Sequence, residues 1–136
     1  QRVFQNISPG ALRLQAMAIT RMRLLANQRL AVITLSQQDF KDCNALMEDA
    51  EEIINLPRRL ETVDVAVLLT EMQISTPHEP RTKASLRTRP PFDAGQFCQE
   101  RGGGGHARAA GCELACSLDT AADMLIAQMQ QLWFPL

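Results

Sequence analysis

The stretch VDVAVLL, residues 63–69, is the clearest strand signal in the sequence. β-Branched and aliphatic residues dominate it, and the turn-rich connection STPHEP, residues 75–80, follows shortly after. Short apolar runs of this composition, bounded by turn residues, are typical of strands. A second run, LAVITL at residues 30–35, is short and rich in β-branched residues. The two runs predict buried strands.

Helical patterns flank these strands. From Ala11 to Arg29 the sequence has neither Gly nor Pro, its apolar residues recur at helical spacing, and SPG at residues 8–10 is typical of a helix start. Residues 39–56 are acidic and favour a helix, or two short ones, that Pro57 ends. A last helix is predicted from Ser117 through Leu132.

The remaining elements lie between residues 83 and 115. A strand is predicted around Lys83–Thr88, a short helix over Phe92–Arg101, and a short strand near Gly111–Ala115. The order of elements is therefore α-β-α-β-β-α-β-α. It predicts an α/β fold: a single domain with a mixed β-sheet flanked by helices and preceded by an N-terminal linker helix.

Length and composition exclude several classes of protein. With 136 residues, 46% of them hydrophobic and 21% charged, the chain has the size and composition of one globular domain, which excludes disordered, collagen-like and low-complexity proteins. No run approaches the roughly 18 consecutive apolar residues of a membrane span. The sequence starts at Gln1 without an initiator Met, so we expect a trimmed or excised piece. Four cysteines form no disulfide framework in a chain of this size, which predicts a reducing, cytoplasmic location.

Charge is segregated along the chain although the formal net charge is only −1. Residues 1–29 contain five arginines and no acid, and residues 81–108 contain six basic residues against two acidic ones. Between these segments, residues 30–64 hold eight acids against three basic residues. This distribution excludes binding of a polyelectrolyte through overall charge, but it allows a local basic patch.

Five of the seven glycines fall within the ten residues GGGGHARAAG, residues 102–111. One glycine suffices to end a helix, whereas several in succession let backbone amides approach an anion closely. The motif follows a predicted helix and precedes a strand, the reverse of the P-loop and dinucleotide-binding arrangements. A purely structural turn remains the alternative. The candidate anion-binding residues are Gly102, Gly103, Gly104, Gly105, His106 and Arg108.

The stretch SLRTR, residues 85–89, is the second candidate site. Alternate residues of a strand share a face, so Ser85, Arg87 and Arg89 are predicted to project together. Two guanidinium groups and a hydroxyl on one face suit an anionic ligand. A solvated sheet face, with charges that prevent aggregation, is the alternative.

Together, SLRTR, the short helix after it and GGGGHARAAG resemble the C-terminal substrate-binding domain, the DHH-associated domain, of DHH-family phosphoesterases. The sequence looks most similar to the branch of bifunctional nano-RNases and pAp phosphatases (pAp is 3′-phosphoadenosine 5′-phosphate), and more distantly to RecJ-type exonucleases. The resemblance covers roughly residues 30–132. It implies that residues 1–29 are a linker helix from a missing N-terminal DHH catalytic domain, and that residues 30–136 are the substrate-binding domain.

The resemblance also implies a division of labour. In such enzymes the N-terminal domain holds Mn²⁺ with Asp and His ligands, and the intact enzyme hydrolyses short single-stranded RNA or DNA, or nucleotide bisphosphates such as pAp. Carried over by position, Gly103, Gly104, Gly105 and His106 would contact the phosphate near the scissile bond, and Ser85 and Arg87 a base or the adjoining phosphate. The chain has only two histidines, so we expect it to bind no metal itself and to have no catalytic residue.

Three alternatives remain open from the sequence. The intact enzyme could be a cyclic-dinucleotide phosphodiesterase. The domain could instead be a non-catalytic nucleic-acid-binding or interaction module. Related domains are also attached to alanyl-tRNA synthetases, where they contact tRNA. None of these interpretations includes a membrane partner.

Overall fold

Two parallel strands form the centre of the fold. A computed structural model describes residues 6–136, in which β2 (Leu30–Leu35) pairs in parallel with β3 (Val65–Glu71), from Leu30 opposite Val65 to Leu35 opposite Thr70. Almost every residue of both strands is buried. Strands covered on both faces have continuous apolar sequences, which explains why these two runs were the strongest signals in the sequence.

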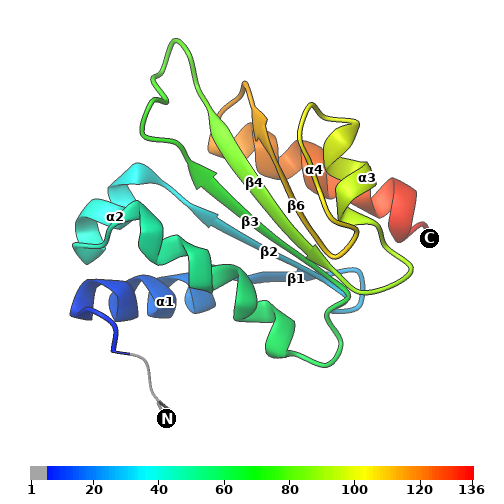
Figure 1. The fold of residues 1–136 in the computed structure, drawn as a ribbon, viewed down its shortest axis with the longest axis horizontal. Helices are drawn as coiled ribbons and strands as arrows, with labels where there is room; N and C mark the ends of the chain where they lie inside the picture. The colour runs from blue at the N-terminus through cyan, green and yellow to red at the C-terminus, as the bar shows by residue number, and fades with distance from the viewer. Residues whose placement is uncertain (1–5) are drawn as a thin grey trace.

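Four further strands extend this pair into a six-stranded mixed sheet with the order β1-β2-β3-β4-β6-β5 (Figure 1). On one side the short β1 (Arg23–Leu25) pairs antiparallel with β2. On the other side β4 (Thr82–Thr88), β6 (Ala109–Leu114) and β5 (Gly104–Gly105) follow, each antiparallel to its neighbour. The predicted α/β domain with a mixed sheet flanked by helices is confirmed.

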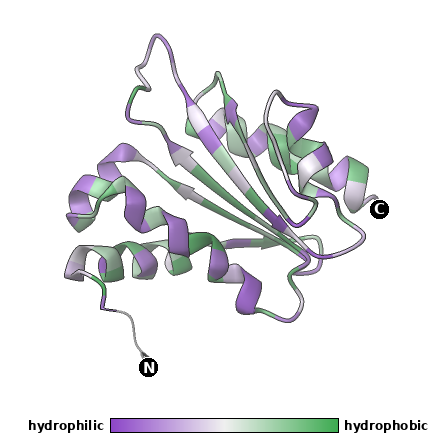
Figure 2. Cartoon of the chain, viewed as in Figure 1, coloured by the Kyte–Doolittle hydropathy of each residue, from purple (hydrophilic) through white to green (hydrophobic). Residues whose placement is uncertain are grey.

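Helices cover both faces of the sheet, and hydrophobic residues gather on the sides that face it (Figure 2). On one face lie α1 (Pro9–Arg21), α2 (Gln37–Cys43) and two 3-10 helices, η1 (Met47–Asn55) and η2 (Pro57–Arg59). Their core includes Leu14, Ile33, Ile53 and Leu68. On the other face, α3 (Ala94–Gln99) and α4 (Leu118–Trp133) pack over a core that includes Leu86, Phe97, Leu125 and Met129.

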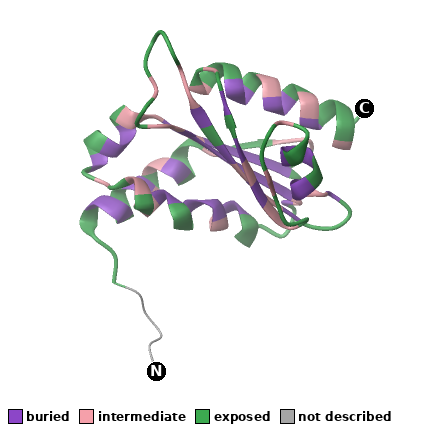
Figure 3. Cartoon of the chain, turned by 45° about the horizontal axis from the view of Figure 1, so that its top comes forward, coloured by how far each residue is buried: buried purple, intermediate pink, exposed green. Residues whose placement is uncertain are grey.

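The first helical layer covers only part of its face. On β2 and β3 the residues beneath it, such as Ile33 and Leu68, are buried. On β4 and β6 the residues of the same face are exposed or half-buried, among them Ser85 and Gly111 (Figure 3). The sheet therefore presents an uncovered surface next to η1.

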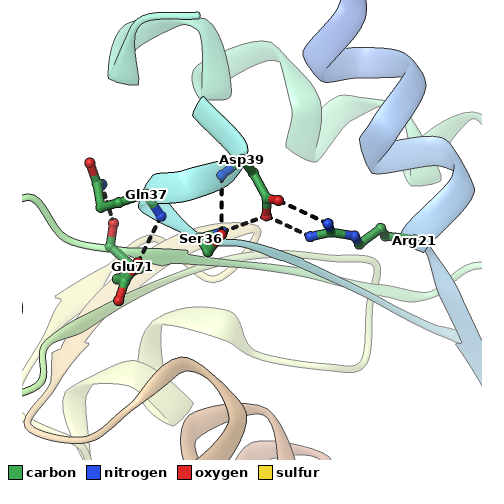
Figure 4. A network of polar contacts seen from close by, with 5 residues as sticks. All are labelled: Arg21, Ser36, Gln37, Asp39 and Glu71. Atoms are coloured by element: carbon green, nitrogen blue, oxygen red, sulfur yellow. Dashed lines mark hydrogen bonds and ion pairs between the residues drawn. The ribbon is translucent and has the colours of Figure 1, made fainter. Parts of the chain in front are cut away.

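A polar network fixes the layer that borders this surface (Figure 4). Ser36 caps α2 by accepting a hydrogen bond from the Asp39 amide (3.1 Å), and the Asp39 carboxylate accepts from the Ser36 amide (2.7 Å) and from Arg21 at the end of α1 (2.8 Å). Gln37 donates from its side chain to the carbonyl oxygen of Glu71 (2.6 Å). The C-terminal ends of α1 and β3 are thereby both tied to the start of α2.

One expectation about local structure was wrong. The helix predicted over residues 11–29 ends at Arg21, because residues 23–25 pair with β2 and the turn that follows has three successive left-handed residues, Ala26–Gln28. The acidic stretch 39–56 forms two short helices, one α-helix and one 3-10 helix, which is the second of the two alternatives predicted for it. Of the predicted linker segment 1–29, residues 1–5 lie outside the described residues. Within residues 6–136, no helix has the length and apolar character needed to cross a membrane.

Candidate functional site

Three polar side chains project from one face of β4. Thr82, Ala84, Leu86 and Thr88 are buried, whereas the alternate residues Lys83, Ser85 and Arg87 are exposed or half-buried. The strand period of two separates the two sets. The predicted pairing of Ser85 and Arg87 on one face is therefore present in the structure.

Lys83 belongs to this face but was not among the predicted site residues. It lies two residues before Ser85 in the same strand, and its exposure matches that of a residue on the open face. The signal that could have identified it is the same alternation extended by one step toward the N-terminus. Its ammonium group adds a second cation to the face.

Arg89 lies beyond the end of β4 and does not project with Ser85. Its guanidinium donates to the carbonyl oxygens of Glu61 (2.8 Å), Arg58 (3.3 Å) and Leu60 (3.4 Å). Arg89 therefore ties the segment 58–61 to the end of the strand. Pro90 and Pro91 follow, and because proline has no amide N–H to donate, the ladder of the strand does not continue past Arg89.

The glycine motif begins where α3 ends and then forms the edge strand β5. Gly102 has a φ of +85°, a left-handed backbone that favours glycine after a helix. A Cβ at Gly103 would lie 2.2 Å from the carbonyl oxygen of Gly111, and one at Gly105 would lie 2.6 Å from the Cα of Ala110. These three glycines are accounted for by the fold itself.

Gly104 differs from the other three glycines. A Cβ at this position would meet no atom within 4 Å, and the backbone there is not left-handed. In the register of the sheet Gly104 lies opposite Gly111, which lies opposite Ser85. Residues directly opposite each other share a face, so the row Ser85–Gly111–Gly104 is a strip of sheet on which one hydroxyl is followed by bare backbone. A ligand can approach the backbone closely along this strip.

His106 lies two residues after Gly104, in the tight turn between β5 and β6. Its amide donates to the carbonyl oxygen of Ala109 (2.8 Å), and the Ala109 amide donates back to His106 (3.2 Å). The residue is exposed, and its imidazole makes no hydrogen bond within the described part of the chain. It is free to contact a ligand that extends past Gly105.

The Arg108 side chain binds carbonyl groups of the backbone and does not face the strip. Its guanidinium donates to the carbonyl oxygens of Phe92 (2.8 Å) and Thr88 (3.4 Å). These bonds fix the segment between β4 and α3. Of the predicted anion-binding residues, Arg89 and Arg108 are therefore both engaged with carbonyl groups of this chain.

Hollows lie at both sides of the strip. One of about 550 Å³ lies between η1 and β4 and is lined by Lys83, Ser85 and Arg87, with Leu68 and Glu51 among its other residues. This volume is within the range of small-molecule sites. Another, of about 510 Å³, lies toward the sheet edge, where Lys83 and Gly111 line it together with Gly102 and Gly103. Because Lys83 lines both hollows, the two are parts of one surface.

Arg87 has an unusual electrostatic environment. Burial lowers the pKa of its guanidinium, and the charge of Arg58 lowers this pKa further. Its one hydrogen bond goes to the neighbouring carbonyl oxygen of Leu86 (2.9 Å), and no carboxylate of residues 6–136 pairs with it. A half-buried cation without a counterion favours binding of an anion.

A larger hollow, of about 710 Å³, lies elsewhere, between the turn after β1 and the end of α4. Its one charged side chain, Arg29, is engaged with Asp64 (2.8 Å) and lies over the ring of Phe134 (4.9 Å to the centroid). This hollow therefore offers no unpaired cation comparable to Arg87.

The groups that this site presents can bind an anion. Among residues 6–136, no cluster of three or more His, Cys, Asp or Glu side chains could hold a metal ion. The residues described here therefore do not fit the Mn²⁺ site that the sequence resemblance places in a separate domain. What they offer is a hydroxyl, two cations and exposed backbone on one face.

Comparisons with known proteins give the family and the fold of the chain. The model of the DHHA1 domain family matches residues 27–131, more than half of the chain. An exopolyphosphatase-related protein from Bacteroides fragilis superposes with a TM-score of 0.83 at 23% identity, over 95% of this chain and 36% of that one. A pGpG-specific phosphodiesterase from Vibrio cholerae superposes with a TM-score of 0.61 at 14% identity, over 90% of this chain and 38% of that one. The chain spans little more than a third of either protein's length, and no curated protein matches it.

Proposed function

The chain belongs to the DHHA1 domain family, and on that premise we propose that it is the substrate-binding part of a phosphoesterase. Its ligands are the phosphate groups of short single-stranded oligonucleotides or of nucleotide bisphosphates such as pAp. The observation that supports this most directly is the strip Ser85–Gly111–Gly104, flanked by Arg87 and Lys83.

The flanking cations suit a phosphoryl group. The guanidinium of Arg87 can form two parallel hydrogen bonds to phosphate oxygens, and the Lys83 ammonium adds a second positive charge. The bare backbone at Gly104 admits a flat base or a phosphate that any side chain would displace. The imidazole of His106 then contacts the phosphate at the sheet edge. The amides of Gly102 and Gly103 are not available to it, because they already donate to the carbonyl oxygens of Gln99 (3.2 Å) and Cys98 (2.9 Å).

Hydrolysis requires a second domain. In the proposal a DHH domain outside this chain holds Mn²⁺, which polarises phosphoryl oxygens and activates water when it is bound. The contribution of this chain is to hold the nucleotide and orient its phosphate. The length of the two similar proteins, and the pGpG substrate for which one of them is named, support a larger enzyme that acts on short oligonucleotides.

An NMR amide titration with pAp and with a 5′-phosphorylated RNA dinucleotide tests the proposal. We expect the amides of Gly102–Gly105 and of the Arg87 strand to shift, and the shifts to disappear in Arg87→Ala and in His106→Ala. Arg23→Ala, which removes a cation from the opposite edge of the sheet, is the matched control and should leave them unchanged. The proposal is wrong if millimolar ligand moves none of these amides, or if a structured RNA binds more tightly than the dinucleotide.

A further inference from the structure

A separate hollow of about 220 Å³ lies beside the strip, at the end of β4, and four arginines line it. Arg58 and Arg59 come from η2, Arg87 from β4, and Arg89 from the residue after that strand's end. No sequence motif identified Arg58 or Arg59. Arg87 also lines the 550 Å³ hollow over the strip, so it stands between the two.

The backbone around this hollow is held in place. The guanidinium of Arg89 binds three carbonyl oxygens of the segment 58–61, and the Arg89 amide donates to the carbonyl oxygen of Asp64 (2.8 Å). Arg58 donates to the side chain of Asn55 (3.0 Å). Arg58 and Arg89 are thus positioned by contacts that need no ligand.

Their charges are not neutralised within the described residues. Asp64 is the one acid that lines the hollow, and its carboxylate pairs with Arg29 (2.8 Å), which does not line it. None of the four arginines forms an ion pair with a carboxylate of residues 6–136. Arg58 is close enough for its charge to disfavour the charged form of Arg87 and so lower the pKa of that guanidinium. An anion bound between them would relieve this repulsion.

We propose that the arginine hollow is a second anion subsite, which holds a phosphoryl group of the same ligand whose first phosphate lies on the strip. The inference rests on the proposed function for the first phosphate. The hollow is smaller than the 300–1,000 Å³ or so typical of whole-ligand pockets, so it fits a phosphoryl group rather than a nucleotide. With the proposed function, the ligand class is a nucleotide that carries two phosphoryl groups separated by a nucleoside.

The test compares two ligands that differ by one phosphate. Adenosine 5′-monophosphate and adenosine 3′,5′-bisphosphate are titrated into the 136-residue chain, into Arg58→Ala/Arg59→Ala, and into a charge-matched control, Arg23→Ala/Lys41→Ala. Neither control residue lines the hollow, and the carbonyl oxygen that Arg89 binds at position 58 is retained in the test variant. Inorganic tripolyphosphate is a third ligand, in which no nucleoside separates the phosphates.

In Arg58→Ala/Arg59→Ala we expect a loss of the preference for the bisphosphate over the monophosphate. Replacing both arginines should weaken bisphosphate binding about tenfold or more, the size of one lost charge-assisted contact, and change monophosphate binding less than twofold. The inference is overturned if both nucleotides weaken equally, if neither does, or if only tripolyphosphate depends on Arg58 and Arg59. If the unmodified chain binds no nucleotide, the proposed function itself fails. If the variant still binds the monophosphate and still prefers the bisphosphate to the same extent, only the second subsite is disproved and the proposed function stands.

Discussion

Gly104 of β5 lies directly opposite Gly111 of β6, so that two residues without side chains are adjacent on the face that also presents Ser85. The neighbouring Gly103 has a different role, because a Cβ there would lie 2.2 Å from the carbonyl oxygen of Gly111. One position is glycine for reasons of packing, and the other has open space in front of it. Within one motif, Gly103 is therefore required for folding, whereas Gly104 is available for binding.

Filling the open position should abolish binding while leaving the fold intact. Valine at Gly104 meets no atom within 4 Å at its Cβ and suits a strand, so Gly104→Val should change the free energy of unfolding by less than about 1 kcal/mol. Its side chain occupies the strip, and we expect affinity for pAp to fall at least about tenfold. Urea denaturation and an NMR titration of the same sample measure the two effects. Full affinity in Gly104→Val would show that the ligand does not use the strip.

A substitution at Gly103, in contrast to one at Gly104, should lower the stability of the fold. The methyl group of Gly103→Ala collides with backbone and with the Cβ of Cys112, neither of which is the end of a flexible side chain. We expect the free energy of unfolding to fall by about 1–3 kcal/mol, as for other overpacked sites. Urea denaturation measures it. If Gly103→Ala is as stable as the unmodified chain, β5 does not approach β6 as closely as described.

Arg87 should be required for binding but not for stability. Its guanidinium is half-buried, repelled by Arg58, and lacks a carboxylate partner in the described chain. Arg87→Met keeps the aliphatic stem and removes the charge. We expect the free energy of unfolding without ligand to stay the same or to rise by about 0.5–1 kcal/mol, as at other functional sites that trade stability for activity. Nucleotide binding should be lost in the same variant, and lower stability would contradict this account of Arg87.

The central strands and the outer helices were predictable because their residues bury a continuous or periodic apolar face. The run at residues 30–35 coincides with β2, and the run at residues 63–69 overlaps β3. The weaker elements were not predictable. Residues 23–29 have good helix formers, and the strand at residues 23–25 exists because β2 pairs with it. Likewise β5 consists of two glycines with no strand propensity, and its only partner is β6.

The residues of the candidate site were likewise only partly predictable from the sequence. Alternation along a strand placed Ser85 and Arg87 on one face, as the structure has them. It also included Arg89, which lies beyond the strand and turns to the segment 58–61 instead. A sequence pattern does not reveal which carbonyl groups an arginine will meet after the chain folds. Arg58, twenty-nine positions before Arg87, could be brought to it only by the tertiary structure.

The four cysteines should differ in their reactivity toward a thiol-alkylating reagent. Cys43, Cys98 and Cys112 are buried, and Cys116 is half-buried just after β6. The hydrogen bond to Cys112 and burial both raise the pKa of the Cys98 thiol, and burial raises that of Cys116. The hydrogen bond with Cys98 lowers the pKa of Cys112 to about 7, but Cys112 is buried. At pH 8 we therefore expect one slow modification, at Cys116, and complete modification of all four in urea. Mass spectrometry with peptide mapping distinguishes the sites, and rapid native labelling of Cys98 would contradict the packing of α3 on β6.

Asp39 should make the stability of the chain depend on pH in the acidic range. Burial by itself would raise the pKa of this carboxyl group, but the hydrogen bonds from Arg21 and Ser36 outweigh burial and lower it. A carboxylate whose folded pKa is depressed stabilises the fold above its unfolded pKa, about 4, and this contribution is lost as the pH falls further through the folded value. Urea denaturation in steps from pH 7 down to pH 3 should therefore show stability falling below about pH 4.

Asp39→Asn should remove this dependence. Because the side chain is 4% exposed and joins α1 to α2, we expect the variant to lose about 1.5–3 kcal/mol at pH 7, as for hydrogen bonds to a charged group. Its stability should then fall less steeply below pH 4 than that of the unmodified chain. Asp42→Asn, an exposed carboxylate on the same helix that bonds only Gln38, is the control and should behave like the unmodified chain. Equal losses in the two variants would mean that helix charge, and not the contact between α1 and α2, accounts for the effect.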